Sequence, residues 1–198
     1  IEFEAQKLFR LYDFDPSEMT EFERYKFLRS KRVGVDCSGM AYQVYRAAAE
    51  TVLGLDLAMV INRRGGLLGE IDKKVFSFKR ERRIASRHLT SDLNSFSIPL
   101  KDLKVGDMIK MSTLDPKIGH VALVYDLDDK NIVYAHSSFH TKTVGPHLDT
   151  INVIDWDGRL EDQEWLETSA DRKVNLSSRV KESEGMGPRR LKIFKDLT

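Results

Sequence analysis

The sequence predicts an α+β domain in which helices come first and an antiparallel sheet follows. Two observations carry this prediction. After Cys37, apolar residues recur at helical spacing, and from Pro99 onward the pattern changes to short strands separated by polar turns. The chain has no internal repeat, and its 198 residues, 41% of them hydrophobic, suffice for one domain with a sizeable core.

Three helices are predicted, over residues 2–11, from Thr20 onward, and from Cys37 to about Leu53. Thr20 and Glu23 have the spacing of a capping box, in which each side chain bonds the backbone N–H of the other residue. Residues 13–17, which include Pro16, fit a turn between the first two helices. Gly54 fits a C-cap, because glycine readily adopts the left-handed conformation that ends many helices.

Strands are predicted over residues 108–111, 119–125, 132–137, 149–154 and 190–195. The polar run 126–131 joins the second and third of these as an antiparallel hairpin. Residues 55–98 fit an insertion or a lid, with a turn at 62–66, a short strand at 75–78 and His88 on the surface.

The composition excludes several classes of protein. A net charge of +1 gives no broad basic field for nucleic acid. Cys37 is the only cysteine, which excludes an internal disulfide framework and a multi-cysteine metal site. The sequence contains no run of 18 apolar residues, so no membrane span is predicted, and no signal peptide is visible. Because the chain begins at Ile1, we expect a trimmed fragment from which an export signal would have been removed.

Cys37 lies where an extended segment meets the third helix. Asp36 and Ser38 are good N-cap residues, and Gly39 tolerates a close approach. Free backbone N–H groups and the positive end of the helix dipole favour the nucleophilic thiolate at such a position. The same N–H groups can hold an oxyanion. The alternative interpretation is that Cys37 is a small buried hydrophobic residue, which is the commoner role of a lone cysteine.

His120 and His136 lie on the two strands of the predicted hairpin. Side chains alternate across a strand, so His120 shares a face with Val124, and His136 shares one with Tyr134. A loop of odd length centred on Asp128 places His136 directly opposite His120, close enough for one imidazole to orient the other. A loop of even length places the two histidines on opposite faces.

Nucleophilic cysteine chemistry needs a thiol, a base and a group that orients the base. Cys37, His120 and His136 supply all three. A zinc site built from these three residues and His140 is an alternative, but the spacings match no compact zinc motif. We therefore favour the nucleophile, and we expect no metal and no cofactor.

Three motifs follow one another along the chain: Asp36-Cys37-Ser38-Gly39, then Val105-Gly106-Asp107-Met108-Ile109, then Gly119-His120-Val121-Ala122-Leu123-Val124-Tyr125. Their order resembles that of the NlpC-type cell-wall peptidases, which are papain-like cysteine hydrolases of bacteria. Residues 189–192 also resemble the last strand of that family. The resemblance covers residues 20–54, 99–138 and 188–195. It implies a circularly permuted papain-like fold, in which the helix of the nucleophile packs on an antiparallel sheet that carries the base.

The resemblance also implies roles for individual residues. Cys37 would be the nucleophile and His120 the general base and acid. The hydroxyl of Tyr25, twelve positions before the cysteine, would help to hold the oxyanion. Asp36 and Ser38 would contribute to binding the amine end of a substrate.

The chain departs from the family pattern in three respects. Phe27-Leu28 stands near the usual Gly-Gly pair, and the usual third catalytic position aligns with Tyr134 or Val133 rather than with His136. The stretches at about 55–98 and 139–187 exceed the usual family core. We therefore predict a single papain-like domain over residues 1–198 with two insertions.

The leading hypothesis is a cysteine peptidase or amidase that cleaves an amide bond through an acyl-enzyme. By resemblance, the expected partner is a peptide or a peptidoglycan stem peptide, which would place the protein in the periplasm or outside the cell. One alternative is a catalytically inactive binding or regulatory module with the same fold. Another is an acyltransferase or amidase that acts on a substrate outside the cell wall. The oligomeric state, the exact substrate and the compartment stay open.

Overall fold

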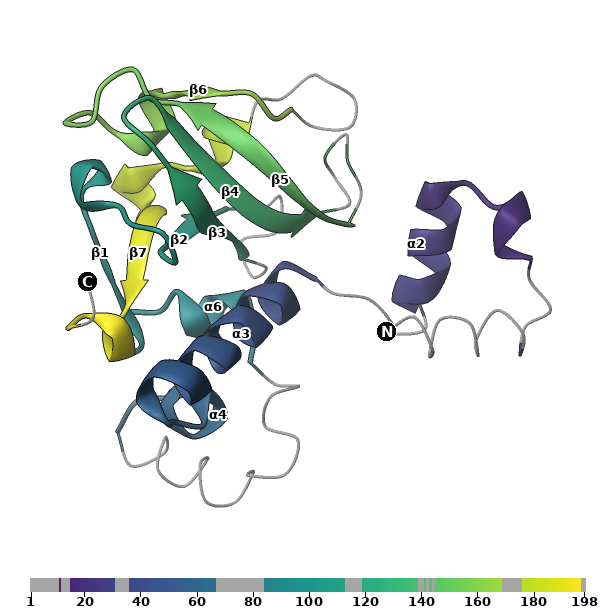
Figure 1. Cartoon of the computed structure of the whole chain (residues 1–198), viewed down its shortest axis with the longest axis horizontal. Coiled ribbons are helices and arrows are strands. Elements are labelled where there is room, and N and C mark those ends of the chain that lie inside the picture. The colour runs from purple at the N-terminus through teal and green to yellow at the C-terminus, as the bar shows by residue number, and fades with distance from the viewer. Residues whose placement is uncertain are drawn as a thin grey trace.

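The computed structural model describes residues 11, 15–30, 36–66, 84–112, 119–138, 141, 143, 145–168 and 176–196. In this part of the chain, helices and a seven-stranded antiparallel sheet form an α+β structure, which confirms the predicted fold class. Figure 1 shows a curled sheet beside α3 (Cys37–Ala48), with α2 (Glu21–Ser30) set apart from both.

The helices follow the predicted signals closely. Thr20 and Glu23 exchange hydrogen bonds, because the Thr20 hydroxyl accepts the N–H of Glu23 and the Glu23 carboxylate accepts the N–H of Thr20. The capping box before α2 is therefore confirmed. Helix α3 continues as a π-helical turn, η2 (Ala49–Leu53), and ends at Gly54 with a φ of 64°, as predicted. The remaining short helices are η1 (Pro16–Glu18), α4 (Leu57–Val60) and α6 (Ser86–Leu89). The helix predicted over residues 2–11, apart from Leu11, and the strand predicted at 75–78 lie outside the described residues.

The strands are β1 (Ser95–Ser97), β2 (Met108–Met111), β3 (His120–Leu127), β4 (Asn131–Ser138), β5 (Gly145–Asn152), β6 (Glu164–Trp165) and β7 (Gly187–Leu191). Their order across the sheet is β1-β7-β2-β3-β4-β5-β6. The strand nearest the C-terminus, β7, therefore pairs with both β1 and β2 inside the sheet. Short 3-10 turns complete the connections: η4 (Leu100–Asp102), η5 (Leu160–Asp162), η6 (Leu176–Arg179), η7 (Glu182–Glu184) and η8 (Lys192–Phe194).

Two hydrophobic clusters cover the two faces of the sheet. Alternate residues of β3 enter different clusters, since neighbouring side chains on a strand point in opposite directions. Val121 and Leu123 pack in the cluster that contains residues of α3, α4 and α6. Ala122 and Val124 pack in the other cluster, with residues of β4, β5 and η6. The first half of β3, which begins with His120, is consequently buried on both sides.

A buried ion pair ties the predicted Gly-Asp turn to the last strand. Arg190 of β7 donates hydrogen bonds from Nε and Nη2 to the two carboxylate oxygens of Asp107, at 2.7 and 2.8 Å. This bidentate geometry is the strongest form of an arginine–carboxylate contact. Gly106, just before the aspartate, has a φ of 90°, which glycine adopts without strain.

The β3–β4 hairpin forms as predicted, but the register between its strands differs from the prediction. Leu127 pairs with Ile132 across a loop of even length, which by itself would send His120 and His136 to opposite faces. A β-bulge between Val124 and Asp126 adds one residue to β3 and restores the shared face. His136 is therefore offset by two residues from the position directly opposite His120.

Strand β5 begins earlier than predicted. It starts at Gly145 rather than Asp149 and pairs with β4 along its whole length. Pro146 obscured this start, because proline is rare within sheets. Among the described residues β6 pairs only with Ile151 and Asn152, so Pro146 lies where its missing N–H interrupts no ladder. As a result His147, which precedes the predicted strand at 149–154, lies in β5 and pairs in register with His136.

The expectations for His88 and for the closing strand are also corrected. His88 is buried rather than on the surface, and its Nδ1 accepts the N–H of Ala85 at the start of α6. The closing strand runs over 187–191 rather than 190–195, because the chain turns into η8 after Leu191. The stretches predicted as insertions also contribute to the sheet, since they contain β1, β5 and β6.

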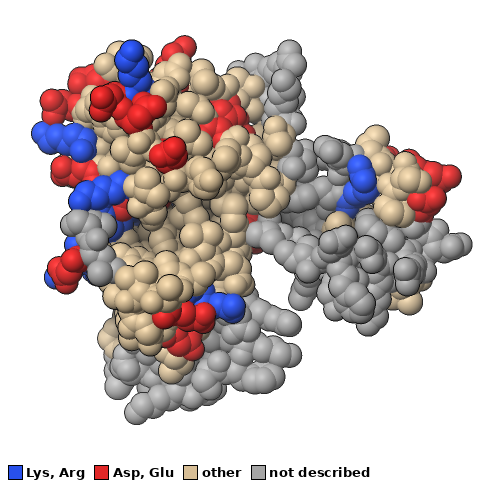
Figure 2. All heavy atoms as spheres, viewed as in Figure 1, with Lys and Arg blue, Asp and Glu red and all other residues tan. Residues whose placement is uncertain are grey.

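The surface carries charges of both signs. On the face shown in Figure 2, described acidic and basic side chains are intermixed mainly on the left of the view, and the centre of this face is largely uncharged. None of the helices in the described part of the chain has the length and hydrophobicity that a membrane crossing requires.

Candidate active site

Cys37 is the first residue of α3, as the sequence predicts. The Asp36 carboxylate caps the helix by accepting the N–H of Gly39 at 2.6 Å, and it also accepts the Ser38 hydroxyl at 2.9 Å. Asp36 and Ser38 are thus engaged with each other at the helix start, and their predicted contacts with a substrate stay predictions. The thiol is free and partly buried, and it packs against the cluster between α3 and the sheet.

The electrostatics of the thiol differ from the expectation. Burial raises the pKa of Cys37 above its ordinary value, and the negative charge of Asp36 acts in the same direction. Hydrogen bonds from the backbone N–H groups of Val121, Ser38 and Cys37 itself act in the opposite direction but do not outweigh the burial. At neutral pH the resting group is therefore the thiol rather than the predicted thiolate.

The contact with Val121 brings Cys37 to the start of β3. That N–H belongs to the peptide between His120 and Val121, so the thiol lies beside the backbone of the predicted base. The strand is fixed just before this point, because the Ser86 hydroxyl of α6 donates to the carbonyl of Gly119 at 2.7 Å. The sheet and two helices together position the start of β3 against the cysteine.

His120 and His136 are in direct contact. Nε2 of His120 lies 2.8 Å from Nδ1 of His136, and the two rings meet edge to face. Both side chains are buried, His136 completely. The two histidines that the sequence singled out are thus joined by a hydrogen bond, although they lie diagonally across the hairpin rather than directly opposite each other.

Behind His136 lies a hydrogen-bonded group centred on Glu167 and His147, neither of which was predicted from the sequence. Nε2 of His136 is 2.8 Å from one carboxylate oxygen of Glu167, and Nε2 of His147 is 2.7 Å from the other. The hydroxyl of Tyr134 donates to Glu167 at 2.7 Å. Glu167 follows β6 in a stretch that reads only as polar, and no local pattern marks it. The buried carboxylate is revealed only by the pairing of β4 with β5 and of β5 with β6.

The charge on Glu167 is strongly stabilised. Burial by itself raises the pKa of a carboxyl group, but hydrogen bonds from His136, His147 and Tyr134 lower the pKa of Glu167 to about 2. For His147, burial lowers the pKa, and the hydrogen bonds to Glu167 and to the Gly145 carbonyl raise it by more, so its pKa is above the ordinary value. Glu167 is therefore an anion at neutral pH, and His147 is biased toward its cationic form.

These contacts indicate which ring nitrogen carries the proton in His136 and in His120. Because the Glu167 carboxylate accepts, Nε2 of His136 carries a proton, and in the neutral imidazole Nδ1 is then an acceptor. His120 must donate from Nε2 to that acceptor, so the lone pair of His120 lies on Nδ1. The arrangement His120–His136–Glu167 thus fixes the tautomer that a general base requires.

Two predicted residues stay without a structural account. Tyr25 belongs to α2, but its side chain lies outside the described residues, so its role in holding an oxyanion stays a prediction. His140 also lies outside them, so the four-residue zinc site that includes it is not described.

Comparison of the chain with models of protein families, with curated proteins and with solved structures gave no match.

Proposed function

We propose that this protein is a cysteine hydrolase that cleaves amide bonds, with Cys37 as nucleophile and His120 as general base and acid. The observation that carries the proposal is the hydrogen-bonded chain from His120 through His136 to Glu167, which starts beside the helix-terminal thiol. A thiol, a base and an orienting group are the three components that this chemistry needs. Packing alone does not require a carboxylate to orient two buried histidines in series.

The proposed reaction begins with a neutral thiol and a neutral imidazole. Nδ1 of His120 takes the proton of Cys37 as the sulfur attacks the substrate carbonyl, and the imidazolium that forms is stabilised through His136 by the charge of Glu167. The backbone N–H of Cys37, which lies against the thiol in the resting protein, holds the oxyanion at the helix start. His120 then gives the proton to the leaving amine, and water hydrolyses the acyl-enzyme with His120 again as base.

The substrate class rests on the resemblance to NlpC-type peptidases. Those enzymes are papain-like hydrolases of the cell wall, so we propose a peptidoglycan stem peptide as the substrate and a papain-like fold for the domain. A wall substrate implies a location in the periplasm or outside the cell. An amide outside the cell wall, or an acyl transfer to an amine, is distinguished by product analysis.

The test is turnover of soluble peptidoglycan stem peptides by the parent protein, Cys37→Ala and His120→Ala. We expect cleavage by the parent and a loss of about 10⁶-fold in each variant, comparable to the loss of the nucleophile or the base in other triad hydrolases. Circular dichroism and thermal unfolding show whether the variants fold. Cleavage that persists in folded Cys37→Ala rejects the proposal.

The raised pKa of Cys37 favours a second candidate, a binding module that keeps the fold without catalysis. This candidate predicts that the parent protein binds stem peptides without cleaving them. It also predicts that Cys37→Ala binds them with the same affinity as the parent, as measured by calorimetry.

A further inference from the structure

Three side chains on the side of His136 away from His120 direct their ligand atoms to one point. Nε2 of His136 and Nε2 of His147 are 2.9 Å apart, and both lie within 2.7 to 3.1 Å of the Glu167 carboxylate oxygens. All three side chains are at most 8% exposed. Among the described residues this is the one group of histidine, cysteine and acidic side chains whose ligand atoms converge closely enough to hold a metal ion.

The protons in this cluster are crowded. Nδ1 of His147 lies 2.8 Å from the carbonyl of Gly145, which can only accept, so Nδ1 carries a proton. If both Nε2 atoms also donate to Glu167, two N–H donors face each other across 2.9 Å. A single cation between the two nitrogens and the carboxylate replaces these opposed donors with three coordinate bonds.

The surroundings orient the ligands in the manner of a metal site. Histidines that bind metals usually donate their other N–H to a carbonyl or a carboxylate, which fixes the ring. His147 is held in this way by Gly145, and Nδ1 of His136 meets His120. The Tyr134 hydroxyl holds the Glu167 carboxylate from a third direction.

We propose that His136, His147 and Glu167 bind one divalent transition-metal ion, with Zn²⁺ as the favoured occupant. Two imidazoles and one carboxylate form a donor set that zinc uses in proteins, with one coordination position left for water or another ligand. Tetrahedral zinc bonds of about 2.0–2.1 Å separate their ligand atoms by roughly 3.3 Å. The observed separations of 2.7 to 3.1 Å thus need only a small outward movement of the rings.

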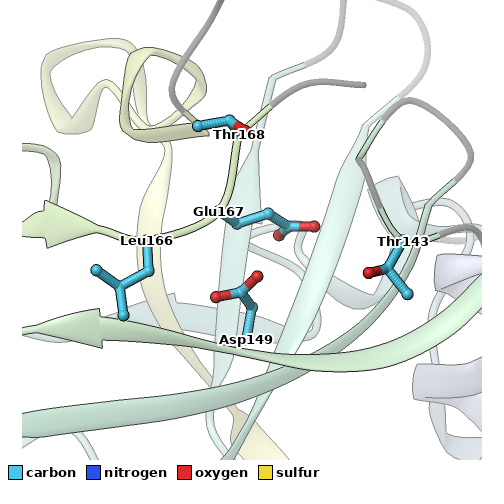
Figure 3. A pocket seen from close by; sticks show the side chains of 5 residues that line it. All are labelled: Thr143, Asp149, Leu166, Glu167 and Thr168. Carbon is cyan, nitrogen blue, oxygen red and sulfur yellow. The ribbon is translucent and has the colours of Figure 1, made fainter. Parts of the chain in front are cut away.

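A pocket adjoins Glu167, one of the three residues of the cluster. This pocket of about 250 Å³ is lined by Thr143, Asp149, Leu166, Glu167 and Thr168. Figure 3 shows the carboxylates of Asp149 and Glu167 close to each other in this pocket, with Thr143 opposite. Two carboxylates and two threonines give this pocket a polar lining that suits a cation beside Glu167.

Metal binding would also act on the proposed base. With the ion on Nε2, His136 carries its proton on Nδ1 and donates it to Nε2 of His120. His120 then holds its own proton on Nδ1, the atom that must accept the proton of Cys37. A bound ion would therefore prevent His120 from acting as the base. This consequence rests on the proposed function, whereas the metal site itself does not.

The test is titration of the metal-free protein with Co²⁺, whose visible absorption reports tetrahedral coordination, followed by displacement with Zn²⁺. We expect one Co²⁺ per chain and no sulfur-to-cobalt charge-transfer band. In His147→Ala and His147→Gln the affinity falls by about 100-fold or more, beyond the roughly 10–100-fold cost of losing an outer partner. Cys37→Ala is the matched control and keeps the parent affinity, because the thiol is not a ligand.

Absence of stoichiometric Co²⁺ and Zn²⁺ binding to the folded parent overturns the proposal. Binding that survives both His147 variants, or that is lost in Cys37→Ala, overturns it as well, since the ion would then bind elsewhere. If the parent cleaves its substrate, turnover is expected to fall as the Co²⁺ absorption saturates. If turnover is unchanged when the metal site is saturated with Co²⁺, the proposed effect of the ion on His120 is rejected. The conclusion that the protein binds the ion is not affected by that result.

Discussion

The two sides of the candidate active site are built in different ways. On the helix side, Cys37 depends on one exposed cap, Asp36, and its thiol has a pKa raised by burial. On the sheet side, His120 and His136 belong to a buried chain that ends in an anionic carboxylate with three hydrogen-bond donors. The imidazole of His120 is thus oriented by hydrogen bonds before any substrate binds, whereas the thiol of Cys37 is still protonated.

This difference indicates that the thiol of Cys37 is activated by His120 rather than by its own position at the helix start. A pre-formed thiolate–imidazolium pair would need a lowered thiol pKa, which burial prevents. The fixed tautomer of His120 instead allows proton transfer at the moment of attack. Substitutions that alter one side of the site at a time test this difference.

The largest expected effect is the pH dependence of Cys37 alkylation by iodoacetamide. Only the thiolate reacts, and its fraction rises about tenfold per pH unit below the pKa. Because the pKa is raised, we expect slow alkylation at pH 6 and a half-maximal rate above pH 8.5, the approximate pKa of an ordinary thiol. His120→Ala is the control, and its profile is expected to be similar. A half-maximal rate below pH 7 that depends on His120 would show that the thiolate forms in advance.

The next effect concerns the stability of the sheet side. Glu167→Gln removes a buried charge that accepts bonds from two histidines and a tyrosine, and it leaves His147 without its counter-charge. We expect the free energy of unfolding to fall by about 3–5 kcal/mol, the usual cost of breaking a buried ion pair. Urea denaturation at pH 7 measures it. Glu164→Gln, at an exposed position of β6, is the matched control and should change stability by no more than about 0.5 kcal/mol.

Tyr134→Phe tests the same chain with a smaller change. The variant keeps the ring in the core and removes only the hydroxyl that donates to Glu167 at 2.7 Å. A hydrogen bond to a charged group contributes about 1.5–3 kcal/mol, so a loss of that size is expected in urea denaturation. A neutral result would mean that the two histidines alone stabilise the carboxylate.

The smallest expected effect lies on the helix side. Asp36→Ala removes the N-cap of α3 and its bonds to Gly39 and Ser38. Loss of such a cap costs about 1 kcal/mol. If urea denaturation shows that Asp36→Ala lowers the free energy of unfolding as much as Glu167→Gln does, the helix side is as strongly stabilised as the sheet side. The difference between the two sides is then rejected.

Much of the fold could be predicted from local sequence signals. The capping box at Thr20, the C-cap at Gly54 and the hairpin strands depend on short-range chemistry, and the structure follows them. The boundaries of β5 and β7 could not be predicted, because each includes a proline that reads as a break and is tolerated only by its place in the sheet.

The candidate site divides in the same manner. The residues that flank Cys37 are recognisable as helix caps, so the sequence indicates a cysteine at a helix start. The alternation of side chains along the two strands indicates the faces on which His120 and His136 lie. Glu167 and His147 acquire their importance only through pairing between distant strands, which joins residues 31 and 11 positions from His136. The raised pKa of the thiol likewise follows from burial, which the sequence around Cys37 does not report.

The bulge at Tyr125 has a consequence for how this hairpin tolerates insertions and deletions. Its one extra residue compensates for an even loop, so the meeting of His120 and His136 depends on a count of residues between them. Removing one residue from either the bulge or the loop would turn one imidazole toward the helices. Removing one from each would leave the pair on a common face. Lengths in this segment are therefore expected to change in steps of two, and single-residue changes to disconnect the base from the carboxylate behind it.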